Sequence, residues 1–205
     1  MASISLQPFK TMGSLTGLFN TESRGLTQGD AQDDPAVRLQ LCSGAIGSAV
    51  TTSMWGGLGV LECVPTAESV TGSIIVAPTA TQCNAFTVFN QAYHGITTPS
   101  SPVPQFLPGG SIHYYRIGSG ARIPLPISED VAALAAASTP SPVGAVGFVW
   151  DLTNNWIDLY DETVTTNPRI AVRLLQVSNG GNQMVSKDTD GNLIWDDAPA
   201  GLFLI

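Results

Sequence analysis

The chain has 205 residues, of which 43% are hydrophobic, and 16 acidic against 8 basic side chains give it a net charge of −8. This length suits one large all-β domain or two small ones, and the apolar content argues against a disordered chain. The acidic balance argues against nucleic-acid and anionic-membrane partners, because both reward clusters of Lys and Arg.

Targeting and cofactor signals are absent from the sequence pattern. No apolar run approaches the length of a membrane span, and the first twenty residues lack a signal-peptide core, so we expect a product made in a cytoplasm. Cys42, Cys63 and Cys83 are widely spaced and form no C-x-x-C pair, which disfavours a zinc site and predicts small buried hydrophobes. We expect no metal and no cofactor.

Residues 1–35 are polar and rich in Gly, Thr and Gln, with Leu15, Leu18 and Phe19 as scattered apolar anchors. Such a segment is either a mobile tail or an arm that becomes ordered on a partner. We assign it to an extended N-terminal arm and residues 36–205 to a single all-β domain. Asp34 before Pro35 predicts the start of a short helix.

Short apolar runs cut by glycines follow, from Val37 to Val64. Trp55 lies beside two glycines and is either a core residue or an exposed contact. Further strands are predicted at Ser73–Val76 and at 85–90. Residues 97–110 hold four prolines, which predict a long rigid surface loop or crossover and not a hairpin.

Charge is scarce over much of the chain. From Leu39 to Tyr115 only Glu62 and Glu68 are charged. A free protein is expected to spread charge over its surface for solubility. This half is therefore either folded inward or covered by a partner.

Residues 108–127 predict a strand, a glycine corner at 118–120 and a second extended run. The prolines of that second run belong at a sheet edge. Strand alternation puts Tyr114 and Arg116 on one face and Tyr115 on the other. Arg116 and Arg122 flank the corner, and arginines beside aromatic rings are typical of protein interfaces.

The C-terminal part predicts one helix and several strands. Ser128 begins the helix, which is expected over residues 128–138. A hairpin over 145–161 turns at Asn154 and Asn155, and this register places Asp151 opposite Asp158. A strand over 170–177, a turn at 190–191 and an apolar terminal strand, residues 201–205, complete the chain.

Many short strands separated by turn signals predict an all-β fold, more specifically a jelly-roll-like β-sandwich with one short helix and an extended N-terminal arm. Fold alone assigns no function.

Three ordered motifs carry a resemblance to a known family. The motifs are YYRIGSGARIPLPI at 114–127, DDPAVR at 33–38 followed by MWGG at 54–57, and FNQAYHGI at 89–96. Over about residues 19 to 175 the chain resembles the structural cement, or decoration, proteins of tailed-bacteriophage capsids.

The resemblance implies a non-catalytic virion protein that binds the capsid exterior and bridges major capsid protein subunits, after assembly in the host bacterial cytoplasm. It also implies self-association, as a homodimer or homotrimer on a local symmetry axis. Residue type and motif position predict these contacts: Leu15, Leu18, Phe19, Met54, Trp55, Tyr114, Tyr115, Arg116 and Arg122.

Two other functions stay open. One is a non-catalytic carbohydrate- or receptor-binding β-module of a virion, which a Trp or Tyr pair in a groove beside Asn and Asp would favour. The other is a glycosidase that uses Asp151 and Asp158 as its carboxylate pair. For the second pattern we favour two solvated aspartates on the outer face of a hairpin, because a regular hairpin gives no reason for a cleft there.

Overall fold

The computed structural model describes residues 25–31, 35–65, 72–89, 96–136, 146–163 and 166–205. Among these residues strands dominate and the helices are short, so the all-β prediction is confirmed. The helical elements are α1 (Pro35–Arg38), α2 (Glu129–Ala133) and the 3-10 turn η1 (Leu134–Ala136).

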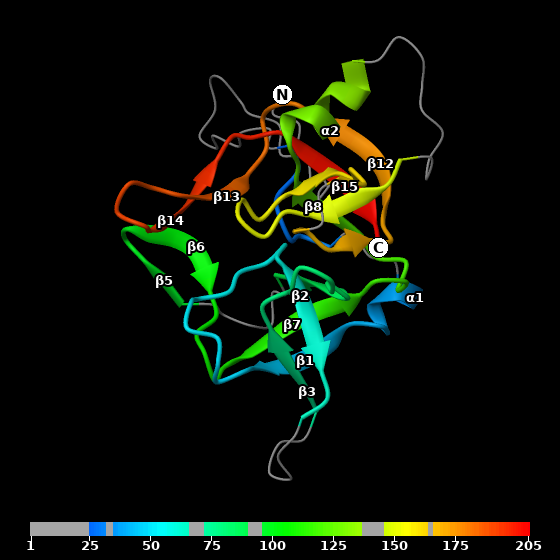
Figure 1. Cartoon of the computed structure of the whole chain (residues 1–205). Helices are drawn as coiled ribbons and strands as arrows, with labels where there is room; N and C mark the ends of the chain where they lie inside the picture. Colours follow the sequence, from blue (N-terminus) through cyan, green and yellow to red (C-terminus); the bar gives the residue numbers. More distant parts are fainter. Residues whose placement is uncertain (1–24, 32–34, 66–71, 90–95, 137–145, 164–165) are drawn as a thin grey trace.

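Five strands close into a barrel in the order β1-β3-β2-β4-β7 (Figure 1). β1 and β3 run parallel, and the other neighbours are antiparallel. Closure leaves no free sheet edge within this barrel. The strands are β1 (Cys42–Ile46), β2 (Gly59–Cys63), β3 (Ser73–Val76), β4 (Ala85–Val88) and β7 (Ser111–Arg116).

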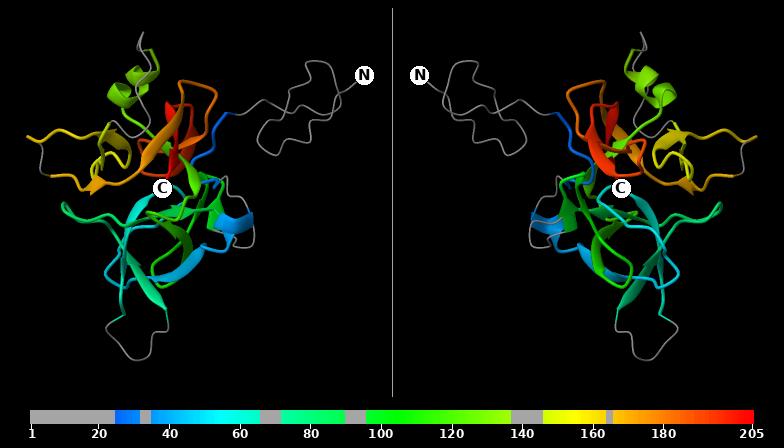
Figure 2. Two further views of the ribbon diagram at one scale, coloured as in Figure 1. Left: turned by 90° about the vertical axis from the view of Figure 1, so that its right-hand side faces the viewer. Right: turned by 90° about the vertical axis from the view of Figure 1, so that its left-hand side faces the viewer.

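The chain from residue 122 onward forms a second body, which we call the cap (Figures 1 and 2). Three small sheets make up the cap, in the orders β12-β15-β8, β10-β9-β11 and β13-β14. Its strands are β8 (Arg122–Pro126), β9 (Phe148–Trp150), β10 (Ile157–Leu159), β11 (Arg169–Ile170), β12 (Arg173–Ser178), β13 (Met184–Lys187), β14 (Leu193–Asp196) and β15 (Ala200–Leu204).

One continuous hydrophobic core joins the barrel and the cap. Trp150 of β9 lies edge-on to Phe86 of β4, with the ring centroids 5.5 Å apart. Its indole also lies against Gly59 of β2, where an added Cβ would come within 2.8 Å of the ring. Glycine at this position therefore lets a fully buried tryptophan of the cap pack directly on the barrel wall.

Several predicted elements are confirmed. Ser128 caps α2, since its side chain accepts a hydrogen bond from the Val131 N–H. Pro124 and Pro126 lie in β8, whose one strand partner within the described sheets is β15. The corner after β7 uses positive φ at Gly118 and Gly120. The terminal apolar run forms β15, the central strand of its sheet.

The prediction that residues 97–110 form a loop and not a hairpin is wrong. β5 (Ile96–Thr98) and β6 (Ser101–Gln105) pair as an antiparallel hairpin. The paired positions on β6 are Ser101 and Gln105, so its two prolines need not donate to the ladder. The apolar side chain of Val103 lies fully buried.

Other element boundaries differ from the sequence prediction. The strand expected over 170–177 is interrupted at residues 171–172 and continues as β12. The α-helix after Ser128 spans only Glu129–Ala133 before it tightens into η1, and residues 137–138 lie outside the described part. The Asp34 cap also lies outside the described residues, whereas α1 is present.

The described end of the predicted arm belongs to the folded body. Thr27 forms a bridge with Gln183, the Gly29 N–H donates to the Pro124 carbonyl, and the Gly29 carbonyl accepts from the Phe89 N–H. Gln28 is almost fully buried. Residues 25–31 are therefore part of the folded body and not of a separate arm, because their backbone groups find partners in both the barrel and the cap.

Candidate contact surface and groove

The barrel side of the molecule carries almost no net charge. Within the described part of residues 39–115, Glu62 is the one charged side chain. It lies on β2 and is paired with Arg116, the last residue of β7. A charge-free surface loses little solvation energy when a partner covers it.

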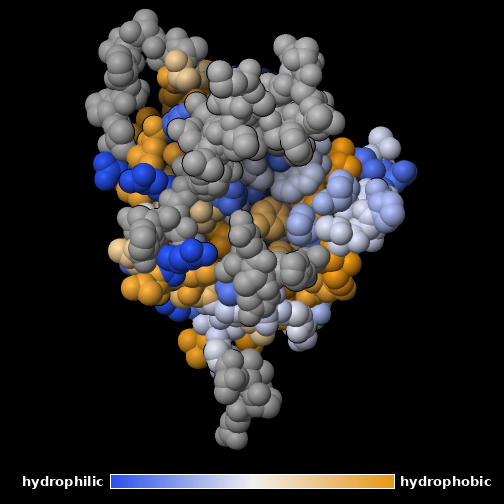
Figure 3. Space-filling model, turned by 180° about the vertical axis from the view of Figure 1, so that it is seen from behind, coloured by the Kyte–Doolittle hydropathy of each residue, from blue (hydrophilic) through white to orange (hydrophobic). Residues whose placement is uncertain are grey.

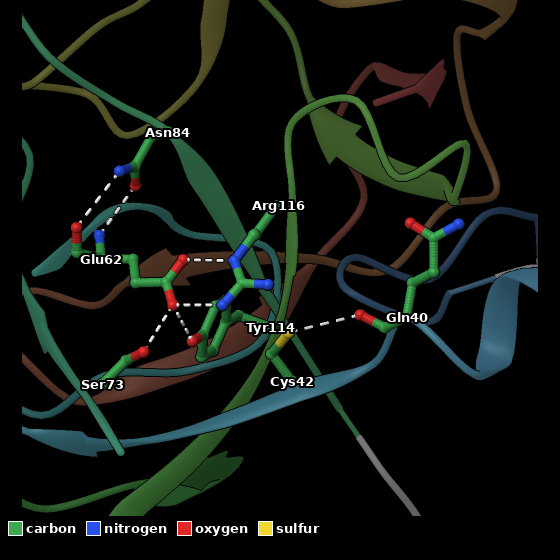
Figure 4. A network of polar contacts seen from close by, with 7 residues as sticks. All are labelled: Gln40, Cys42, Glu62, Ser73, Asn84, Tyr114 and Arg116. Atoms are coloured by element: carbon green, nitrogen blue, oxygen red, sulfur yellow. Dashed lines mark hydrogen bonds and ion pairs between the residues drawn. The ribbon is translucent and has the colours of Figure 1, made fainter. Parts of the chain in front are cut away.

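Glu62 is the centre of a polar network on the barrel wall (Figure 4). Arg116 donates to both carboxylate oxygens, with Nε 2.6 Å from Oε2 and Nη2 2.7 Å from Oε1. Oε1 also accepts from the Ser73 hydroxyl at 2.5 Å and from the Tyr114 hydroxyl at 2.6 Å. The Asn84 side chain pairs with the Glu62 backbone N–H and C=O.

These contacts fix the ionisation of the network. Hydrogen bonds from Arg116, and to a smaller extent from Ser73 and Tyr114, together lower the pKa of Glu62 to about 2 despite the opposing effect of burial. Burial, with the bond to Glu62, raises the pKa of Tyr114 to about 12. The carboxylate is therefore ionised and neutralised in place across the physiological range.

Large apolar side chains are exposed near this neutral wall. Leu39, which precedes β1, is 88% exposed, and Val64, which directly follows β2, is 86% exposed. Ile96, the first residue of β5, and Leu107, which lies just after β6, are also exposed. In the view from behind, apolar residues reach the surface on both flanks of the body (Figure 3). Exposed apolar groups beside a neutral surface are typical of a protein-binding face.

The cap is acidic, in contrast to the barrel. Residues 117–205 contain ten acidic and four basic side chains, a net charge of −6. All fourteen lie among the described residues. The barrel and the cap occupy opposite ends of the molecule in both side views (Figure 2). One end of the molecule, the barrel, is therefore nearly neutral, and the other end, the cap, is negatively charged.

The structure describes six of the nine predicted contact residues, and four of these are core residues. Met54, Trp55, Tyr114 and Tyr115 are each at most 7% exposed in the single chain, so they present no contact surface. Both faces of β7 are covered at the two tyrosines, which alternation along the strand does not reveal.

The two arginines are exposed, and they differ in their contacts. The guanidinium of Arg116 is held by Glu62, whereas Arg122 at the start of β8 makes no ion pair with a described residue. Leu15, Leu18 and Phe19 lie outside the described residues.

The predicted carboxylate pair does not form. β9 and β10 pair with Ile157 opposite Trp150, a register that leaves Asp151 outside the ladder. The carboxylate of Asp151 instead accepts the backbone N–H groups of Thr153 and Asn154 and closes a longer turn, in which Asn155 has φ 57. Asp158 accepts from the Ser128 hydroxyl at 2.7 Å. The hydrogen bonds from the Asp151 carboxylate to the nearby backbone stabilise this longer turn more than the predicted two-residue turn would be stabilised.

A groove lies between the barrel and the cap. A hollow of about 420 Å³ and a second of about 530 Å³ share Trp55, Asn155 and Lys187 in their walls. Trp156 also lines the second hollow, beside Asn154 and Asp196. A Trp pair near Asn and Asp is the arrangement expected of a carbohydrate-binding module, although Trp55 itself is mostly buried.

Gln28 holds the two walls of the groove together, and sequence reasoning missed it. Its side-chain amide donates to the carbonyls of Gly56 and Gly57 at 3.3 Å, on the barrel side. Its Oε1 accepts from the Val185 N–H at 2.8 Å, on the cap side. The residue stands in a polar, glycine-rich stretch, where the sequence offers no periodicity that marks it as buried.

Thr87 of β4 performs a similar task within the barrel. Its buried hydroxyl donates to the Trp55 carbonyl at 2.6 Å and accepts from the Leu58 N–H at 2.9 Å. These two bonds fix the loop that carries Trp55. The one sequence signal for the role of Thr87 is that a polar residue stands in an otherwise apolar strand.

Within the described residues, no group of three or more His, Cys, Asp or Glu side chains is arranged to hold a metal ion. No helix among them is both long and apolar enough to cross a membrane. No family model, no curated protein and no solved structure matches this chain.

Proposed function

We propose that the chain is a capsid cement protein that binds the outside of a bacteriophage shell and bridges neighbouring major capsid protein subunits. One observation carries the proposal: the two charged side chains of the barrel strands, Glu62 and Arg116, pair with each other, and large apolar side chains are exposed nearby. Such a surface favours burial against protein, since little charge must be desolvated.

The charge asymmetry supports an orientation. In the proposed complex, the neutral barrel faces the shell and the acidic cap faces solvent, where its charge keeps the particle soluble. Because the protein would bind only the assembled shell, each bound copy would stabilise that assembly by mass action. We also propose that the protein binds as a homodimer or homotrimer on a local symmetry axis. The proposal further includes a jelly-roll-like arrangement of the small sheets.

Co-sedimentation of the purified protein with shells that lack it tests the proposal. We expect saturable binding and shells that resist heat better. Leu39→Glu and Val64→Glu place a charge on the neutral side, and we expect each to weaken binding about tenfold, the effect of about 1.4 kcal/mol. Leu175→Glu, at an exposed position of β12 in the cap, is the matched control and leaves binding unchanged.

Two outcomes would contradict the proposal. Absence of the folded protein from the shell pellet at every concentration would remove the capsid role. Equal weakening by the barrel and cap variants would keep the capsid role and remove the proposed orientation.

A second function, a glycan-binding module, is favoured by the groove between the barrel and the cap, which combines aromatic, amide and charged side chains.

A further inference from the structure

The groove contains hydrogen-bond donors that no described residue satisfies. The indole N–H groups of Trp55 and Trp156 are buried and have no acceptor among the described residues, as is also true of Trp150 in the core. The Lys187 ammonium lies 6.0 Å from the centre of the Trp55 ring and makes no ion pair within the described structure. Because the indole nitrogens are covered, the exposed ammonium of Lys187 is the donor that a ligand in the groove can reach, and it favours a ligand that offers a hydrogen-bond acceptor.

The charge of the residues that line the smaller hollow indicates what charge the ligand carries. Lys187 is the one charged residue in its lining. The other polar side chains there are neutral hydroxyl and amide groups, those of Thr52, Ser53, Gln105 and Asn155. A single carboxylate fits beside Lys187, and the neutral groups suit the hydroxyls attached to a sugar ring. Apolar side chains in the same wall match the C–H face of such a ring.

The larger hollow restricts further negative charge. Glu129 and Asp196 stand in its lining with Lys187. Their carboxylates accept hydrogen bonds from hydroxyl groups and repel a second anion. The net charge of −8 acts in the same direction at longer range. A polyanion is therefore disfavoured, whereas a neutral sugar next to one acidic sugar satisfies both hollows.

The walls are held in position before any ligand binds. Gln28 ties the Gly56–Gly57 backbone to β13, the strand that carries Lys187. Thr87 fixes the Trp55 carbonyl. Asn155 is the one non-glycine residue with positive φ in the described chain, and it lines both hollows. A site held in this way loses little entropy on binding.

We propose that this groove binds an oligosaccharide with one carboxylate-bearing sugar, seated at Lys187, next to a neutral sugar that contacts Glu129 and Asp196. Barrel residues such as Val60 and Ala77 contribute to the smaller hollow, but the proposed binding does not depend on the capsid role.

The test uses the isolated full chain without shells and follows its backbone amide resonances by NMR during titration. The probes are glucuronic acid, glucose, acetate and a short glutamate peptide. We expect glucuronic acid to shift groove resonances with a dissociation constant in the range of about 1 mM, and glucose to bind at least about tenfold more weakly.

The variants separate the site from general charge effects. Lys187→Met keeps an unbranched stem next to Trp55 and removes the charge, and it should weaken glucuronic acid binding about tenfold while leaving the weaker binding of glucose unchanged. Arg122→Met, which removes a cap cation that does not line either hollow, is the matched control and should bind like the wild type. Dispersed amide spectra confirm that each variant is folded.

Three outcomes would overturn the inference. Glucuronic acid causes no shifts in the groove, acetate or the glutamate peptide binds as well as glucuronic acid, or Lys187→Met and Arg122→Met behave alike. Because shells are absent, none of these results bears on the cement function.

Discussion

Single residues decide how charge is handled on the barrel. Glu62 would be costly at a neutral surface if it were alone, because a partly buried carboxylate loses hydration. Arg116, Ser73 and Tyr114 replace that hydration with four hydrogen bonds. The Glu62 carboxylate and the Arg116 guanidinium therefore form a neutral ion pair, and no isolated charge remains at this position.

Glu62→Gln should therefore destabilise the protein at neutral pH. The fall of the pKa from 4.5 to about 2 corresponds to about 3 kcal/mol, which water around the half-exposed Arg116 reduces to about 1–2 kcal/mol. Because the folded-state pKa is the lower one, this stabilisation is present above pH 4.5 and is lost as the pH falls toward 2.

Urea denaturation of both proteins across this pH range measures the effect. We expect the difference in unfolding free energy to shrink with falling pH and to vanish near pH 2. Asp190→Asn, at an exposed carboxylate in the β13–β14 turn, is the control and should have little effect. A pH-independent difference between Glu62 and its variant would show that packing, and not ionisation, is responsible.

At the scale of elements, the last strand organises the cap. β15 lies between β12 and β8, so the sheet of three cannot form without it. Phe203 of β15 is fully buried and meets Phe148 of β9 in a T-shaped contact with centroids 5.5 Å apart. The C-terminal residues thus join two of the small sheets.

Phe203→Ala should cost about 3–5 kcal/mol of unfolding free energy, since it leaves a large cavity between these sheets. Chemical denaturation monitored by tryptophan fluorescence measures the loss. Leu175→Ala, at an exposed position on β12, should change stability by less than about 0.5 kcal/mol. Similar small losses for both variants would mean that β15 docks only loosely.

At the scale of the whole molecule, the neutral barrel and the acidic cap predict how docking responds to salt. If the barrel faces the shell, few charges are brought together at the interface, so screening has little to weaken. We expect the affinity for shells to change less than about threefold when salt rises from about 0.05 to 0.5 M.

The same co-sedimentation assay at several salt concentrations checks this expectation. A steep loss of binding with salt would instead indicate that the acidic cap, or the exposed arginines, form the interface. Arg122→Met would then separate these two cases, because it removes a cation and leaves every acidic group in place.

The sequence by itself determined much of the local structure, because local signals act over a few residues. The Ser128 cap, the glycine corner after β7, the edge position of Pro124 and the terminal strand all depend on neighbours in the chain. The scarcity of charge in the first half and the Tyr114–Arg116 face were also visible there, and both became parts of the Glu62 network.

Only the tertiary structure decided which residues are covered and which strands meet. Barrel closure and the cap bury Trp55, Tyr114 and Tyr115, whose residue types suit a core and an interface equally well. The groove needs Gln28, Trp55 and Lys187 from three distant parts of the chain. Such contacts depend on the path of the backbone through space, which no short-range pattern encodes.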